Sequence, residues 1–373
     1  MLVTYEYSRT WHQLTIPGIS SPPNANKLRI SPASFKQLVQ AFNIPASFVD
    51  ALSTHYLPHG HGHHQISTVP GSDSYGHWYL LPVRVQFACT DQRSGHVASA
   101  SNSNQMNPYH YVHLPDMEVD VRGFCIAIYA NHDSATGNSN FVVFNFVQGR
   151  WAKVVEEPQK RVAGAIAHSA NNGQKLSPYF LHLVYLTSVS RWWANVMSSV
   201  YDQLIAYEEG LQEQLDSDNE STHFYAKLDR ALHCIAAHLQ RYRSELNSLE
   251  ATIANIFQLF KEKHGASDTG DRRFTLGLAQ TASQVKATND FCQELEKKLS
   301  NILALVRCSN HFKTIISNTR ALNVVLQAIQ TDTETSQRLT EETRKDSLSM
   351  KTIAVVTMFF LPGATIAVCH FKH

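Results

Sequence analysis

The feature that most constrains this chain is a long stretch near its end that contains no helix breaker. Neither proline nor glycine occurs from Ser309 until Pro362. Apolar residues recur there at intervals of three and four, the spacing of one helix face. The pattern predicts a helix from Ser309 to Val368, roughly 90 Å long, whereas an ordinary globular helix has about 11–12 residues. A helix of this length needs neighbours or a special role to support it.

One face of this predicted helix, which we call the seam, changes from apolar to hydroxyl side chains. Serine and threonine are poor helix formers, so concentrating them on one stripe costs stability. An uncharged, wettable stripe suits the lining of a water-filled conduit between parallel helices. A solvated helix rich in serine and threonine is the alternative, and the pattern leaves both open. The seam residues are Phe312, Ile315, Thr319, Leu322, Leu326, Ile329, Thr333, Ser336, Thr340, Thr343, Ser347, Met350, Ala354, Thr357, Leu361 and Ala364.

Three further helices are predicted upstream. Ser177-Pro178 is a helix start signal, and it precedes an apolar stripe between Val189 and Leu215 that contains Trp193, a predicted core residue. From Phe224 to Phe260 apolar residues step by three and four almost without fault, which predicts a helix wound around a neighbour. A weaker seam of the same kind runs from Val285 to Val306.

The first part of the chain predicts strands, loops and one short helix. The strands are His77–Phe87 and a hairpin of Phe124–Ala130 with Phe141–Val147, the helix lies within Ser34–Phe48, and the loops are His55–Tyr75 and Ser94–Pro108. The fold class is therefore α+β. We expect an N-terminal mixed α/β domain (1–176), a helical coiled region (177–308), a stalk helix (309–349) and a partial transmembrane segment (350–373).

Composition and motifs exclude several functions. Lys+Arg 32 against Asp+Glu 31 is not the basic excess of a nucleic-acid binder. The six cysteines form no CxxC pair, and no Walker A loop, GxSxG or HExxH occurs, so neither a zinc ribbon nor an enzyme is expected. His59, His61, His63 and His64 have metal-ligand chemistry. On a flexible loop they predict weak zinc or nickel binding at most, and a loop without metal is the favoured interpretation.

The apolar run from Ile353 to Cys369 predicts a short membrane-spanning helix. It is broken only by Thr357, Pro362, Gly363 and Thr365. A helix of this length spans about 25 Å, slightly less than the ~30 Å hydrocarbon core. A buried core helix is the alternative, but no later segment follows that would bury it.

The string RKDSLSMKTIAVVTMFFLPGATIAV resembles the end of the stalk helix and the start of the first membrane helix of CorA-like magnesium and zinc transporters, with the fungal branch the most similar. YFLHLVYLTSVSRWWANV and RWAKVVEEP resemble the same branch. The resemblance implies a cytosolic α/β domain, coiled helices, a long stalk, and a pentamer whose first membrane helix lines the pore. It matches Met350 and Ile353 to the hydrophobic gate, and Ser347, Thr357, Leu361 and Ala364 to other pore-facing positions.

The chain departs from this family at its end. The Gly-Met-Asn signature of the pore mouth is absent where Phe371-Lys372-His373 stand, and no second membrane helix follows. We therefore expect a subunit of a Mg²⁺ transporter that does not conduct as given. Its partners would be identical chains, in a homo-pentamer, or full-length paralogues. Most of the chain would face the cytosol, and it would be soluble if the last segment does not insert. The alternative is a non-transporting cytosolic assembly or regulatory protein derived from the same family.

Overall fold

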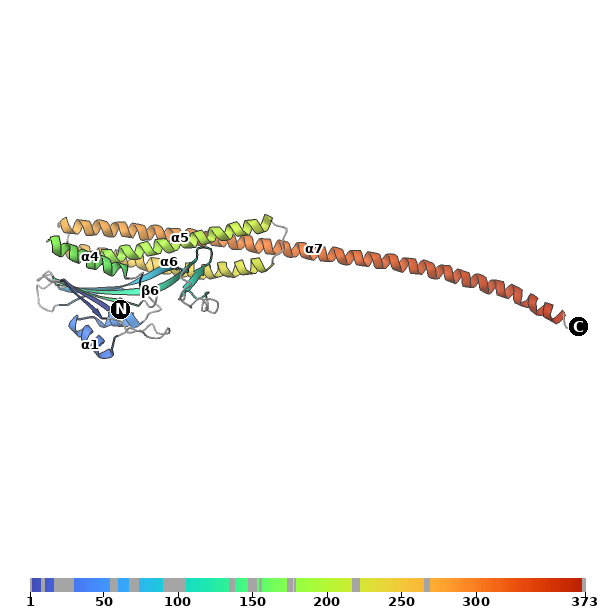
Figure 1. Cartoon of the computed structure of the whole chain (residues 1–373), viewed down its shortest axis with the longest axis horizontal. Helices are drawn as coiled ribbons and strands as arrows, with labels where there is room; N and C mark the ends of the chain where they lie inside the picture. The colour runs from blue at the N-terminus through green and yellow to red at the C-terminus, as the bar shows by residue number, and fades with distance from the viewer. Residues whose placement is uncertain are drawn as a thin grey trace. The chain divides into compact units, whose positions relative to one another are not determined.

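Figure 1 shows the computed structural model of the chain, which divides into two compact units, Met1–Val306 and Arg307–His373. The structure describes residues 2–7, 11–16, 30–53, 60–66, 74–89, 105–109, 111–133, 138–146, 153, 156–172, 177, 179–216, 222–264 and 269–370. Of residues 2–7, 11–16 and 359–370 only the backbone is described.

The first unit contains a seven-stranded antiparallel sheet of order β2-β1-β7-β6-β4-β3, with β5 also paired to β6. The strands are β1 (Leu2–Tyr7), β2 (Trp11–Ile16), β3 (His61–Gln65), β4 (Tyr75–Ala88), β5 (Tyr111–Leu114), β6 (Val119–Asp133) and β7 (Asn138–Asn145). The predicted strand at His77–Phe87 is β4, and the predicted hairpin is β6 with β7. Both strands of that hairpin extend into the turn-rich segment that the prediction left between them, β6 to Asp133 and β7 from Asn138.

Alternate residues of β4 reach two different cores. Trp78 and Leu80 pack on one face of the sheet with Phe48 and other residues of α1 (Pro32–Ala41) and α2 (Ala46–Ser53). Tyr79 and Leu81 pack on the opposite face against the long helices. This two-sided burial explains why β4 is apolar at nearly every position rather than at every second one.

The short helix predicted within Ser34–Phe48 is present as α1, but the prediction missed a second helix, α2, that begins at Ala46. Ser31 caps the first, its hydroxyl accepting a hydrogen bond from the Ser34 amide at 3.0 Å. Asn43 has φ 51°, a left-handed conformation that ends a helix, and Pro45 then precedes the second helix.

The loop predicted for His55–Tyr75 is also wrong in part, because its histidine-rich centre forms β3. This strand pairs with β4, His61 opposite Tyr79 and His63 opposite His77. Gly62 permits the close approach, since a Cβ atom on it would meet the Trp78 indole at 2.8 Å. The glycines that suggest a loop instead make room for a large neighbouring side chain. The loop predicted at Ser94–Pro108 lies mostly outside the described residues.

The other helices in the described part of the chain are α4 (Glu157–Asn172), α5 (Phe180–Asp216), α6 (Thr222–His264) and α7 (Thr269–His370). The predicted stripe on α6 is largely buried, and the stripe on α5 is largely buried as far as Leu211, whereas Leu215 at its end is exposed. Trp193 on α5 is fully buried as predicted. The sheet, α5, α6 and α7 up to Val306 share one hydrophobic core. The separate third and fourth helices of the prediction are one helix of 102 residues, because no glycine or proline follows Gly277 until Pro362.

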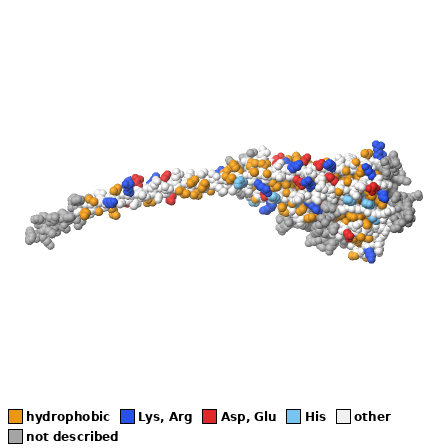
Figure 2. All heavy atoms as spheres, turned by 180° about the vertical axis from the view of Figure 1, so that it is seen from behind, with side chains coloured by type: hydrophobic (Ala, Val, Ile, Leu, Met, Phe, Trp, Pro, Cys, Tyr) orange, Lys and Arg blue, Asp and Glu red, His pale blue; other side chains and the backbone are white. Residues whose placement is uncertain are grey.

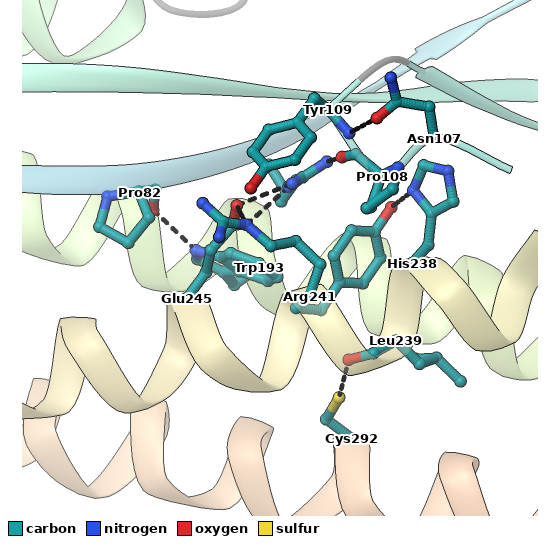
Figure 3. Close-up of polar contacts among 12 residues, drawn as sticks. Pro82, Asn107, Pro108, Tyr109, Trp193, His238, Leu239, Arg241, Glu245 and Cys292 are labelled. Carbon is teal, nitrogen blue, oxygen red and sulfur yellow. Dashed lines mark hydrogen bonds and ion pairs between the residues drawn. The ribbon is translucent and has the colours of Figure 1, made fainter. Parts of the chain in front are cut away.

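A buried ion pair joins the sheet to α6. Arg84 on β4 donates two hydrogen bonds of 2.7 Å to the Glu245 carboxylate. Arg241 donates a third to the same carboxylate at 2.8 Å (Figure 3). Arg84 also donates to the Pro108 carbonyl at 3.0 Å and lies over the Tyr242 ring. Because both partners are buried, this network fixes the position of α6 on the sheet.

Trp193 makes the matching contact from α5. Its indole nitrogen donates to the Pro82 carbonyl at 3.0 Å (Figure 3). Proline is tolerated at this point of β4 because β3 pairs only with Tyr75–Tyr79, so β4 has no strand on that side at Pro82 among the described residues.

Candidate functional site

The seam of α7 is uncovered along the whole described part of the second unit. Phe312 is 64% exposed, Ile329 57% and Met350 73%. Figure 2 shows apolar side chains at the surface of this part of α7. A row of exposed apolar side chains at helical spacing is typical of a surface that packs against another helix.

The hydroxyl part of the seam has a defined orientation of its hydrogen bonds. The hydroxyls of Thr333, Thr340 and Thr343 each donate at 2.7 Å to the carbonyl oxygen one turn earlier. Their hydrogens therefore point along the helix, and the oxygen lone pairs remain for outside donors. Such oxygens accept hydrogen bonds from water, including the water shell of a cation.

The predicted pore-facing residues are only partly described. Ser347, Met350, Ile353 and Thr357 are exposed on α7, whereas the side chains of Leu361 and Ala364 lie outside the description. Within the side chains that the structure does describe, no helix is both long and apolar enough to cross a membrane. The membrane segment predicted from Ile353 to Cys369 extends beyond those side chains, and it stays a prediction.

The four clustered histidines do not gather into one ligand set. His59 lies outside the described residues, and the other three belong to β3. Successive residues of a strand face opposite sides, so His61 and His63 share one face while His64 lies on the other, stacked on Tyr129. Burial lowers the pKa of His64, opposed by a backbone hydrogen bond with Asn43.

Three other histidines do come together, on three different elements. His77 on β4, His132 on β6 and His182 on α5 each offer a ring nitrogen, and these atoms all lie within 4.8 Å of one another. All three side chains are buried, and the rings of His77 and His132 stack with centroids 5.4 Å apart. Sequence reasoning missed this cluster. The only available signal was that two of the three histidines lie in or beside strands that are otherwise apolar.

Hydroxyl groups hold two of these rings. The Tyr79 hydroxyl lies 2.6 Å from Nδ1 of His182, and the Ser139 hydroxyl lies 2.6 Å from Nδ1 of His132. Nε2 of His182 and Nδ1 of His77 are buried without a hydrogen-bond partner among the described residues. The cluster therefore contains ring nitrogens with unused lone pairs or protons in a dry environment.

Burial favours the neutral form of two histidines of the cluster, His77 and His182. Burial lowers the pKa of His77 to about 3, with smaller contributions from His63 and His64. Burial also lowers the pKa of His182 well below its ordinary value, helped by His77 and His132. A neutral imidazole is the form that binds a metal ion.

A second group of possible ligands lies on the same sheet, at Cys89, His113 and Asp120. Nδ1 of His113 already contacts Asp120 at 2.9 Å, and the Cys89 sulfur lies 3.7 Å from the same nitrogen. Since two groups share one ring nitrogen, an ion between them would have to break the existing contact. This group is the weaker candidate for a metal.

Comparison with known proteins does not assign this chain to a family. No family model and no curated protein matches it. A solved structure, the cytoplasmic domain of ZntB from Vibrio parahaemolyticus RIMD 2210633, is similar with a TM-score of 0.44 and 9% sequence identity. The similarity covers 83% of this chain and 97% of that one. At this TM-score the likeness does not by itself establish a shared fold.

Proposed function

We propose that this chain is a subunit of a CorA-like transporter of divalent metal ions, with Mg²⁺ as the transported ion and no enzymatic activity. The observation that carries the proposal is the uncovered seam of α7, which changes from apolar to hydroxyl side chains without a change of phase. The resemblance of the string from Arg344 to Val368 to the stalk and first membrane helix of that family supports it.

Identical chains are the partners that this surface suits best. In a parallel, symmetric assembly the same residue of every chain meets at one level, so Phe312, Leu322 and Ile329 would cover one another. The apolar part would hold the helices together. The first unit would lie on the cytosolic side and the C-terminal segment would enter the membrane. The family resemblance favours five chains.

The hydroxyl part of the seam favours a hard, hydrated ion. Mg²⁺ loses its water shell reluctantly and prefers oxygen ligands. The oxygens of Thr333, Ser336, Thr340 and Thr343 suit a bore through which such an ion passes with its water. Soft ions would be better served by thiolates, which the seam lacks.

The test is the mass of the full chain in mild detergent, measured by light scattering, together with Mg²⁺ influx into proteoliposomes. Ile329→Asp places like charges together on the seam of every subunit, where no partner exists, and should dissociate the assembly. Gln327→Asp adds the same group to the same turn off the seam, and should leave the mass unchanged.

The outcomes bear on both candidate functions. Assembly with Mg²⁺ influx, both lost in Ile329→Asp, supports the transporter subunit and contradicts the expectation that the chain does not conduct as given. Assembly without influx agrees with that expectation and with the non-transporting assembly protein. A monomeric parent chain contradicts both.

A further inference from the structure

We infer that His77, His132 and His182 form a binding site for a borderline divalent cation, with Zn²⁺ the best fit, inside the first unit. The site is distinct from the α7 seam, and the inference does not rest on the proposed function. It gives a reason for burying three histidines together, which the packing of an apolar core does not require.

The geometry suits three imidazole ligands around one ion. His132 lies opposite Tyr75 and His77 lies opposite Ala130, so the two histidines are diagonal neighbours on the same face of the sheet. His182 reaches that face from α5, with its ring centroid 4.8 Å from that of His77. Zn–N bonds of about 2.0–2.1 Å in a tetrahedral site place ligand nitrogens roughly 3.4 Å apart. Side-chain rotations can close the present spacing, which is at most 4.8 Å.

The surroundings are those of a metal site rather than of a neutral packing cluster. A histidine that binds metal through one nitrogen normally has its other ring nitrogen held by a hydrogen-bonding group. Tyr79 holds Nδ1 of His182 in this way, and Nε2 of the same ring is buried with no partner among the described residues. Nδ1 of His77 is likewise buried with no hydrogen-bond partner among the described residues. A bound ion would satisfy both nitrogens.

The chemistry of the ligands selects the ion. Three neutral imidazoles without a carboxylate favour Zn²⁺, Co²⁺, Ni²⁺ or Cu²⁺ over Mg²⁺ and Ca²⁺, which prefer oxygen. The described residues offer no fourth histidine, cysteine or carboxylate within this group, which leaves one position for a water molecule. The site is therefore not expected to bind Mg²⁺, the ion proposed to move along the seam.

An exposed histidine lies beside the buried site. His63 on β3 is directly opposite His77 on β4, so the two side chains share a face of the sheet. His63 is exposed, whereas His77 is buried. His63 can bind an incoming ion at the surface, next to the first buried ligand.

The experiment uses the full chain in mild detergent, stripped of metal with a chelator and titrated with Zn²⁺ or Co²⁺. We expect one tightly bound ion per chain, and X-ray absorption at the zinc edge should count three imidazole nitrogens. His182→Gln should abolish tight binding. Tyr79→Phe keeps the ring but removes the hydroxyl on His182, and should weaken Zn²⁺ binding about 10–100-fold.

The controls address the many other histidines of the chain. His238→Gln changes a buried histidine of α6 outside the cluster, and His61→Gln changes an exposed one; both should bind Zn²⁺ as the parent does. Ile329→Asp should bind Zn²⁺ normally whatever its mass, which separates this inference from the proposed function. The inference is overturned if the parent binds no Zn²⁺ tightly, if its ion lacks three imidazoles, or if His182→Gln or Tyr79→Phe binds with unchanged affinity.

Discussion

At the scale of single residues, the ion pair of Arg84 and Glu245 is the most sensitive point of the first unit. Their side chains are only 2% and 5% exposed. Glu245→Gln would leave the Arg84 charge buried without its counter-ion, which costs about 3–5 kcal/mol of unfolding free energy. Urea unfolding of the full chain, followed by tryptophan fluorescence, measures this loss.

The matched control for that change is an exposed ion pair. Nζ of Lys286 lies 3.5 Å from Oδ2 of Asp290, and the two side chains are 69% and 57% exposed. Asp290→Asn should change the unfolding free energy by less than about 1 kcal/mol, because water screens the pair. Equal losses of unfolding free energy in Glu245→Gln and Asp290→Asn would mean that the buried ion pair stabilises the chain no more than the exposed one.

The buried histidines predict a loss of stability in acid. The pKa of His77 is about 3 in the folded chain against 6.5 when exposed, because burial disfavours the charged ring and His63 and His64 add to the effect. Below pH 6.5 the unfolded chain binds a proton that the folded chain does not. This contribution to stability is therefore complete above pH 6.5 and declines as the pH falls toward 3.

Melting temperature as a function of pH, measured with a chelator present, tests this expectation. His77→Gln should make the decline between pH 6.5 and 3 shallower, whereas His61→Gln, an exposed change, should leave it as in the parent. A decline that is as steep in His77→Gln would show that other groups cause it. The groups on the same side of the sheet as His77 are His63, Tyr75, Tyr79, His132 and His182, and His64 acts on it from the other side.

At the scale of elements, two glycines should respond differently to substitution by alanine. The first lies on a strand, β6, directly against a side chain of the neighbouring strand, and the second lies on a helix, α4, with open space beside it. Gly123 on β6 lies opposite Arg84, and a Cβ atom there would meet the guanidinium carbon at 2.5 Å. Gly123→Ala should displace Arg84 from Glu245 and destabilise the chain by about 1–3 kcal/mol, as overpacking does. Urea unfolding measures the change.

Gly164 on α4 is the comparison, because a Cβ atom there would meet nothing within 4 Å. Gly164→Ala should stabilise the chain by up to about 1 kcal/mol, since alanine favours a helix over glycine. Destabilisation at both positions, to the same extent, would contradict the role given to Arg84.

At the scale of the whole molecule, the two units should differ in how their stability depends on concentration. The described side chains of the α7 seam are exposed in one chain, whereas most of the apolar face of α6 is buried within the same chain. If copies cover the seam, amides of α7 between Phe312 and Leu339 should exchange with deuterium faster on dilution. Amides of α6 should exchange at the same rate at all concentrations.

Hydrogen exchange followed by mass spectrometry at two protein concentrations, at a fixed detergent concentration, provides the measurement. Ile329→Asp should make exchange in α7 fast at both concentrations, and Gln327→Asp should behave as the parent. Exchange in α7 that does not change on dilution of the parent would argue against self-assembly through the seam.

The sequence by itself determined the features that repeat along one element. The steps of three and four from Phe224 to Phe260 place one stripe on α6, and that stripe is buried. Runs of apolar, β-branched and aromatic residues located β4, β6 and β7, although the structure places the ends of these strands differently. These patterns are readable because helix and strand periods are properties of neighbouring residues, whatever they later pack against.

Only the tertiary structure decided which distant residues meet. The histidine-rich segment became a strand because β4 offered a paired edge and Trp78 a surface for Gly62. His77, His132 and His182 converge because strand register and the placement of α5 bring them to one face, and no local pattern carries that information. Packing also decided where the first unit ends within α7, because the helix contributes to the core of that unit only as far as Val306.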